Sequence, residues 1–199
     1  DAAAAAVVRD ALVPLADVAT PNRFELSWLA RQDVQSPEDA AFELKRTVTH
    51  HGFVGGLING HTQGRYLDHE SFAPLWEQAQ HLNVPIYIHP TDPPADIARA
   101  YYDESPSLMT GWGWHVETGT HLLKLITGGV FDAYPGLKII VGHMGELLPY
   151  CFPRLNKALT MGEWLLSTQE AKANIPGRRV RMEKSFSYYM HNNVYVTTS

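Results

Sequence analysis

The chain has 199 residues, of which 45% are hydrophobic and 19% charged, and 16 Lys and Arg against 21 Asp and Glu give a net charge of −5. This composition excludes a disordered tail and a coiled coil, and no basic cluster is dense enough to predict nucleic-acid binding. Since no apolar run approaches the ~18 residues of a membrane helix and the single cysteine, Cys151, suits a reducing compartment, we expect a cytoplasmic protein without a nucleic-acid or membrane partner.

Short β-branched runs alternate with amphipathic helical stretches. A strand is expected at 24–30, and the helix after it has Ser36 as N-cap, Pro37 at its first position and an end near Gly52. The later predicted elements are, in order, a strand at 53–59, a helix at 71–81, a strand at 84–89, a long loop at 90–113, a helix at 116–127, a strand at 137–142, a helix at 147–159, an irregular stretch at 162–184 and a strand at 194–198.

This alternation predicts an α/β fold with a parallel sheet. Two architectures fit, an open doubly wound sheet and a (β/α)₈ TIM-type barrel. The open sheet with a nucleotide site usually carries a Gly-rich turn after a strand, and the sequence has none. The pattern gives five strands of the barrel's eight, and the chain opens at Asp1 without an initiator Met. We therefore expect residues 1–199 to form one partial barrel domain, with at least three strands of the barrel outside this chain.

In both architectures the functional residues follow the carboxyl ends of the strands. Two predicted strands end in histidine, His89 and His143. An imidazole in the place of His89 suits a divalent metal as a neutral ligand. A histidine hydrogen-bonded to a neighbouring loop would give the same pattern, so both interpretations stay open.

His143 lies between two glycines, and Glu146 follows three residues later at a predicted helix start. The carboxylate can accept a hydrogen bond from one ring nitrogen, which fixes the tautomer and holds the other nitrogen toward a cavity. Such a histidine can move a proton, an effect worth about 10²- to 10⁴-fold in rate. The alternative is an acid placed at the helix start by the helix dipole.

The remaining candidates carry weaker signals. His61 follows a strand but equally suits a turn cap, and Trp112 and Trp114 lie in an aromatic stretch that would line either a substrate site or a local hydrophobic cluster. His115 and His121 are six apart and so fall on different helix faces, which argues against a helical metal pair. Glu117 and His121 are four apart, and a structural pair is the favoured interpretation.

Several motifs together resemble the amidohydrolase-2 family. They are GFVGGLINGH at 52–61, VPIYIHP at 84–90, LKIIVGHMGE at 137–146, and GWGW with the following Glu117, Thr118 and His121. The resemblance runs in order from about residue 21 to 199. It is nearest to the hydroxybenzoate decarboxylase branch, which contains γ-resorcylate and 2,3-dihydroxybenzoate decarboxylases and aminocarboxymuconate semialdehyde decarboxylases.

The resemblance implies a (β/α)₈ barrel with one divalent metal ion (Zn, Mn or Mg) at its carboxyl face. His89 matches the family's metal ligand, His143 its proton-handling histidine and Glu146 the acid that orients it. Asn59, His61, Trp112 and Trp114 are the expected substrate-binding residues. The family's first strand supplies a Glu/His-type metal pair and its last strand an Asp, and neither segment is in this chain, so the chain alone is expected to be inactive.

The expected function is metal-dependent, non-oxidative decarboxylation of a hydroxylated aromatic or related unsaturated carboxylic acid, in a homo-oligomer (dimer or tetramer). The proton would come from His143 with Glu146 or from the absent Asp. Three alternatives remain: a metal-dependent hydrolase of a lactone or amide on the same scaffold, a truncated non-catalytic barrel that acts as a binding module, and a hydratase.

Overall fold

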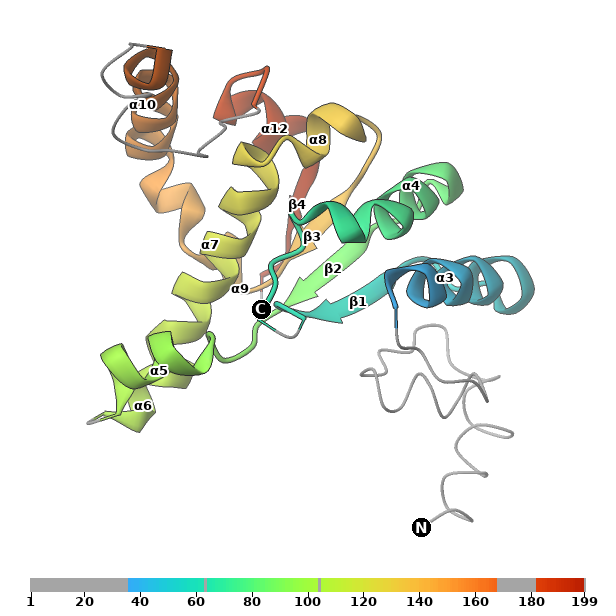
Figure 1. The fold of residues 1–199 in the computed structure, drawn as a ribbon, viewed down its shortest axis with the longest axis horizontal. Helices are drawn as coiled ribbons and strands as arrows, with labels where there is room; N and C mark the ends of the chain where they lie inside the picture. Colours follow the sequence, from blue (N-terminus) through green and yellow to red (C-terminus); the bar gives the residue numbers. More distant parts are fainter. Residues whose placement is uncertain (1–35, 63, 104, 168–181, 199) are drawn as a thin grey trace.

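The structure is a computed structural model, and it describes residues 36–62, 64–103, 105–167 and 182–198 (Figure 1). Its strands form one four-stranded parallel sheet in the order β1 (Gly56–Asn59), β2 (Ile86–His89), β3 (Ile139–Val141) and β4 (Val194–Val196). The sheet order follows the chain order, as in a barrel, whereas a doubly wound sheet reverses direction at a switch point. The strand predicted at 24–30 lies outside the described residues.

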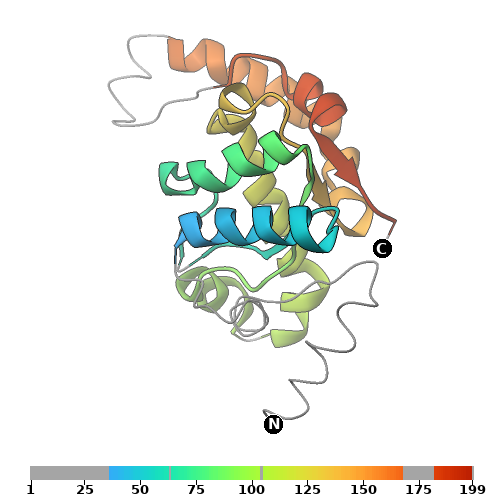
Figure 2. The same ribbon diagram turned by 90° about the vertical axis from the view of Figure 1, so that its right-hand side faces the viewer.

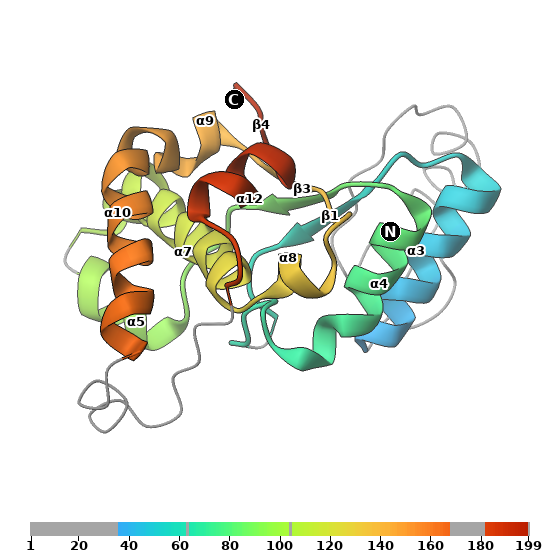
Figure 3. The same ribbon diagram turned by 90° about the horizontal axis from the view of Figure 1, so that it is seen from above.

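Helices connect and cover these strands. In chain order they are α3 (Pro37–His51), η3 (Glu70–Phe72), α4 (Ala73–Leu82), α5 (Ala95–Tyr102), α6 (Pro106–Leu108), the π-helix η4 (Met109–Gly113), α7 (Trp114–Thr127), α8 (Val130–Ala133), α9 (His143–Glu146), α10 (Leu148–Ser167) and α12 (Phe186–Asn192). Figures 2 and 3 show α3 and α4 side by side along the same side of β1 and β2. Among the described helices, none is both long and apolar enough to cross a membrane.

The sheet has one packed face and one more open face. On the packed face Ile86, Ile88, Ile139 and Val141 are buried in a single core with the helices. The side chains that alternate with them along the strands, such as Tyr87, are only half-buried in the described part of the chain. The near-continuous apolar strands predicted a sheet covered on both faces; a closed barrel would cover the second face as its interior.

The first described helix forms as its sequence predicts. Ser36 caps α3 by accepting a bond from the Asp39 backbone N–H at 3.1 Å, and the Asp39 carboxylate accepts one from the Ser36 N–H at 3.0 Å. Gly52 ends the helix with a φ of 71°. These reciprocal bonds satisfy two N–H groups that the first turn leaves unpaired.

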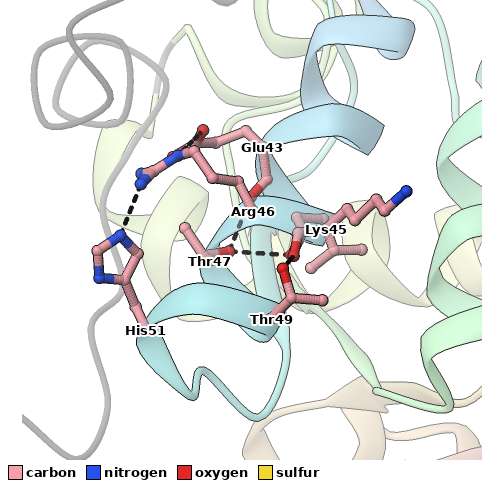
Figure 4. A network of polar contacts seen from close by, with 7 residues as sticks. Glu43, Lys45, Arg46, Thr47, Thr49 and His51 are labelled. Atoms are coloured by element: carbon pink, nitrogen blue, oxygen red, sulfur yellow. Dashed lines mark hydrogen bonds and ion pairs between the residues drawn. The ribbon is translucent and has the colours of Figure 1, made fainter.

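A polar network runs along α3 (Figure 4). The Arg46 guanidinium donates two bonds to the Glu43 carboxylate, at 2.6 and 2.7 Å, and its third nitrogen lies 2.6 Å from His51 Nε2. Glu43 is buried, and its bond raises the pKa of Arg46. The fork-shaped guanidinium therefore neutralises a carboxylate that has little access to water.

The structure corrects the sequence prediction in several places. The stretch predicted as a loop at 90–113 contains α5, α6 and η4, whose prolines stand at or just before helix starts, where the missing N–H is harmless. The helices α8, α9 and α12 were not predicted. Residues 162–167, expected to be irregular, belong to α10, and 168–181 lie outside the described residues.

Candidate active site at the carboxyl ends of the strands

The two histidines predicted to carry chemistry lie at the same edge of the sheet. His89 is the last residue of β2 and pairs with Asn59, the last residue of β1. Ile88 pairs with Val141 at the end of β3, so His143 follows its strand on the same edge. In Figure 1 the arrowheads of β1 and β2 point toward this edge, where α9 lies.

His143 and Glu146 belong to a tight turn with unusual backbone geometry. Every residue from 143 to 147 has a positive φ, between 49° and 75°, and only Gly145 among them lacks a Cβ. Left-handed backbone costs a residue with a side chain roughly 1–2 kcal/mol. The turn is held from outside by a bond from the Met144 N–H to the Thr197 carbonyl at 2.9 Å and by contact of Gly145 with Val196 and Pro149.

Within this turn the Glu146 carboxylate is bound by two imidazole rings. Its Oε1 lies 2.9 Å from His143 Nδ1, and its Oε2 lies 2.6 Å from His115 Nδ1. The carboxylate is 1% exposed, against 41% for the His143 side chain and 27% for His115. An ionised carboxylate can only accept, so both rings donate through Nδ1 and keep Nε2 for other partners. The hydrogen bond expected between His143 and Glu146 is therefore present.

His89 has the arrangement expected of a metal-binding imidazole. Its Nδ1 lies 2.9 Å from the carbonyl oxygen of Pro90, so Nδ1–H donates to the backbone and Nε2 remains available. Histidine ligands of metals are commonly oriented through such a bond. The bond to the neighbouring loop, considered as the alternative, is thus compatible with a ligand role.

The residues present supply only part of a metal site. His89 fits as one imidazole donor, but no group of three or more His, Cys, Asp or Glu within the described ranges can hold a metal ion. A divalent ion at His89 would need donors from outside the described residues.

Two of the four predicted substrate-binding residues, His61 and Trp114, bond to Asp92. Its carbonyl accepts from His61 Nε2 at 3.2 Å, and its carboxylate accepts from the Trp114 indole N–H at 2.7 Å. His61 Nδ1 also accepts from the Gly64 N–H at 3.3 Å, so both of its ring nitrogens are engaged, as the turn-cap alternative expects. Asn59 and Trp112 are exposed. Substrate binding by these residues stays a prediction.

Glu117 and His121 do not bond to each other; both hold the loop after β1. The Glu117 carboxylate accepts from the Tyr66 hydroxyl at 3.0 Å, and His121 Nε2 accepts from the Leu67 N–H at 3.0 Å. Burial raises the pKa of Glu117 and of Tyr66 and lowers the pKa of His121 to about 4. The direct pair expected between them is therefore replaced by two bonds to the loop, and a structural role for both stays a prediction.

Sequence reasoning missed two residues of the site. His115 was considered only as a partner of His121, and the helix was expected to begin after it, at Val116; α7 begins earlier, which places His115 on a regular turn facing Glu146. Tyr87 was treated as part of a strand. Its hydroxyl would collide with a Cβ at position 142, directly before His143, and the period-2 alternation of β2 was the signal for it.

A family model described as amidohydrolase matches residues 4–165. Decarboxylase orsB from Emericella nidulans is 43% identical over 157 residues, which cover 75% of this chain and 47% of that protein. A gamma-resorcylate decarboxylase from a Polaromonas species is 39% identical over 185 residues, covering 90% of this chain and 52% of the relative. The chain therefore spans about half the length of the curated relatives it matches.

Solved structures match as well. The crystal structure of 5-carboxyvanillate decarboxylase from Novosphingobium aromaticivorans, complexed with manganese and 4-hydroxy-3-methoxy-5-nitrobenzoic acid, has a TM-score of 0.71 and 34% identity. The match covers 99% of this chain and 53% of that one. Together with the sequential parallel sheet, this likeness assigns the TIM-barrel fold class predicted from the sequence.

Proposed function

Because the chain belongs to the amidohydrolase family, we propose that the full-length protein is a metal-dependent, non-oxidative decarboxylase of a hydroxylated aromatic carboxylic acid. The relatives and the solved neighbour described above are decarboxylases by name, one of them of gamma-resorcylate and another of 5-carboxyvanillate. The observation that carries the proposal is the bond between His143 Nδ1 and the buried Glu146 carboxylate, beside His89 on the neighbouring strand.

Glu146 orients the ring of His143 for proton transfer. Because Nδ1–H is held by the carboxylate, Nε2 is the ring atom that exchanges protons. The His143 side chain that carries Nε2 is more exposed than the Glu146 side chain. The carboxylate also offsets the positive charge of the ring when both nitrogens are protonated. His143 is therefore the group that delivers a proton to the substrate ring.

The reaction balances without an oxidant. The ring carbon that bears the carboxylate accepts the proton from His143 Nε2, the bond from that carbon to the carboxylate breaks, and the bond's electron pair returns to the ring as CO₂ leaves. His89 would hold a divalent ion such as the manganese of the solved neighbour, and that ion would act as a Lewis acid that orients and polarises the substrate.

The test uses the full-length protein loaded with Mn²⁺ and a panel of hydroxybenzoates that includes γ-resorcylate and 5-carboxyvanillate. In D₂O, decarboxylation yields CO₂ and a phenol with one deuterium at the former carboxylate carbon. A hydrolase would instead open a lactone or amide without releasing CO₂, and a non-catalytic binding module would bind no metal and turn over neither substrate class. Either result would refute the proposal.

Two variants test the residue roles. His143→Asn should retain metal content and lose turnover by about 10²- to 10⁴-fold, whereas His89→Ala should lower both. His81→Ala, at an exposed position on α4, is the matched control and should behave as wild type. Near-normal turnover of His143→Asn would contradict the role given to His143.

We also propose that the protein is cytoplasmic and forms a dimer or tetramer. The exposed, free Cys151 suits a reducing compartment. Light scattering of the full-length protein tests the assembly, and a monomer would contradict it.

A further inference from the structure

The Glu146 carboxylate has a second imidazole partner that the proposed reaction does not use. His115 Nδ1 lies 2.6 Å from Glu146 Oε2, the carboxylate oxygen that His143 does not bond, and the two rings are edge to face with centroids 5.9 Å apart. We propose that His115 is a positioning residue that holds Glu146 so that its other oxygen orients His143. This inference rests on the proposed function.

The first support is that α7 approaches the turn closely on the face that carries His115. Gly119 lies four residues after His115, hence on the same face of the helix. A Cβ at Gly119 would lie 3.4 Å from the Glu146 carbonyl oxygen, so the helix and the turn are in contact there. His115 therefore reaches the carboxylate from a rigid helix.

The second support is that the turn needs external restraint. Four residues with side chains, His143, Met144, Glu146 and Leu147, have positive φ, and each costs roughly 1–2 kcal/mol in this conformation. Thr197, directly after β4, restrains the turn at Met144, and α10 and α7 pack against the turn from other sides. The bond from His115 ties the Glu146 side chain to α7.

The third support is the difference in burial between the Glu146 carboxylate and the two rings that bond to it, those of His115 and His143. The carboxylate is 1% exposed, while both rings reach toward solvent. A buried carboxylate that lost one of its donors would seek another, because an unpaired buried charge is costly. Without His115, the carboxylate is expected to rotate between His143 and water, and the ring of His143 would lose its fixed orientation.

The kinetic test compares His115→Ala with His115→Asn in the full-length enzyme. The Asn side-chain amide places an N–H near the position of Nδ1 and can donate to Glu146 Oε2, whereas Ala cannot. We expect His115→Ala to lower kcat by about 10- to 100-fold with KM within about 2-fold, and His115→Asn to recover most of the loss. If kcat is unchanged in His115→Ala, or if Asn rescues nothing although the variant has wild-type stability, the proposal is overturned.

A double variant separates positioning from a general structural role. With Glu146→Gln already present, His115→Ala should change kcat by less than about 2-fold, because the two residues act through one interaction. If the two losses instead multiply, His115 acts independently of Glu146 and the proposal fails.

A structural readout keeps this inference distinct from the proposed function. If the wild-type protein decarboxylates nothing, the proposed function fails, and the crystal structure of His115→Asn beside His115→Ala still tests the positioning. We expect Glu146 Oε1 within 3.2 Å of His143 Nδ1 in the Asn variant and beyond hydrogen-bond distance in the Ala variant. An intact bond in the Ala variant overturns the inference; if that variant does not fold, displacement of the carboxylate in the Asn variant does so.

Discussion

His121 should make the stability of the protein sensitive to mild acid. Its ring is fully buried, and its Nε2 accepts the Leu67 N–H at 3.0 Å, so the neutral ring carries its proton on Nδ1. A second proton would occupy Nε2, so that the ring N–H would face the Leu67 N–H and the hydrogen bond between them would be lost. Burial, with smaller contributions from the positive charges of His61 and Lys124, lowers the pKa of His121 to about 4.

The direction and size of this pH effect on the free energy of unfolding follow from the difference in proton binding between the folded and unfolded chains. Between pH 6.5 and 4 the unfolded chain binds more protons at His121 than the folded chain does, so the free energy of unfolding falls as the pH falls. A pKa moved from 6.5 to about 4 corresponds to about 3 kcal/mol over the whole window, of which about 2 kcal/mol is already lost at pH 5. The raised pKa of Glu117 acts in the opposite sense, which makes a comparison between variants necessary.

The assay is urea unfolding of the full-length protein and of His121→Gln at several pH values between 7 and 4.5. The Gln carbonyl can accept the Leu67 N–H but cannot be protonated. Trp76, whose indole N–H donates to the Leu67 carbonyl at 3.0 Å, is a fluorescent reporter beside the site. Wild type should lose about 2 kcal/mol more than the variant between pH 7 and 5, and parallel pH profiles for the two proteins would refute the reasoning.

Substitutions test three further local features. Ser36→Ala removes the cap of α3 and should lower the free energy of unfolding by about 1 kcal/mol, measured by urea unfolding; an unchanged midpoint would contradict the cap. Gly142→Ala should lower kcat because its Cβ collides with the Tyr87 hydroxyl, and adding Tyr87→Phe should recover part of the loss; no recovery would exclude that collision as the cause. Met144→Gly, at a half-exposed position with φ of 61°, should raise stability by about 1 kcal/mol, whereas Gly145→Ala should lower it by at least as much; shifts of the same sign would argue against the left-handed turn.

The elements predicted best from the sequence are those defined by local chemistry. The start and end of α3 follow from Ser36, Pro37 and Gly52, each of which acts within one turn of the helix. The β1 strand was predicted from residue 53 because Phe53 and Val54 are apolar, yet it begins at Gly56 and Val54 is 64% exposed. Strand length depends on the neighbouring strand, and periodicity alone does not contain that information.

The site was also predicted only in part, because some of its contacts depend on how separate elements pack together. His89, His143 and Glu146 follow from the rule that chemistry gathers at strand ends. The bond from His115 to Glu146 joins residues on separate elements and depends on where α7 crosses the turn. The positive φ of residues such as Met144 also lacks a sequence signal, because side chains other than glycine rarely adopt it.

The link between Met144 and the carbonyl of Thr197 bears on the order in which the protein assembles. The turn after β3 is closed by a residue that follows β4, so it gains this partner only when a late-synthesised segment reaches the sheet. Contacts between distant segments form slowly, because the intervening chain must first be ordered. During refolding, we expect the amide hydrogen of Met144 to become protected from exchange later than the amide hydrogens of α3 and α4. The helices and strands would then form before the turn that carries His143 and Glu146.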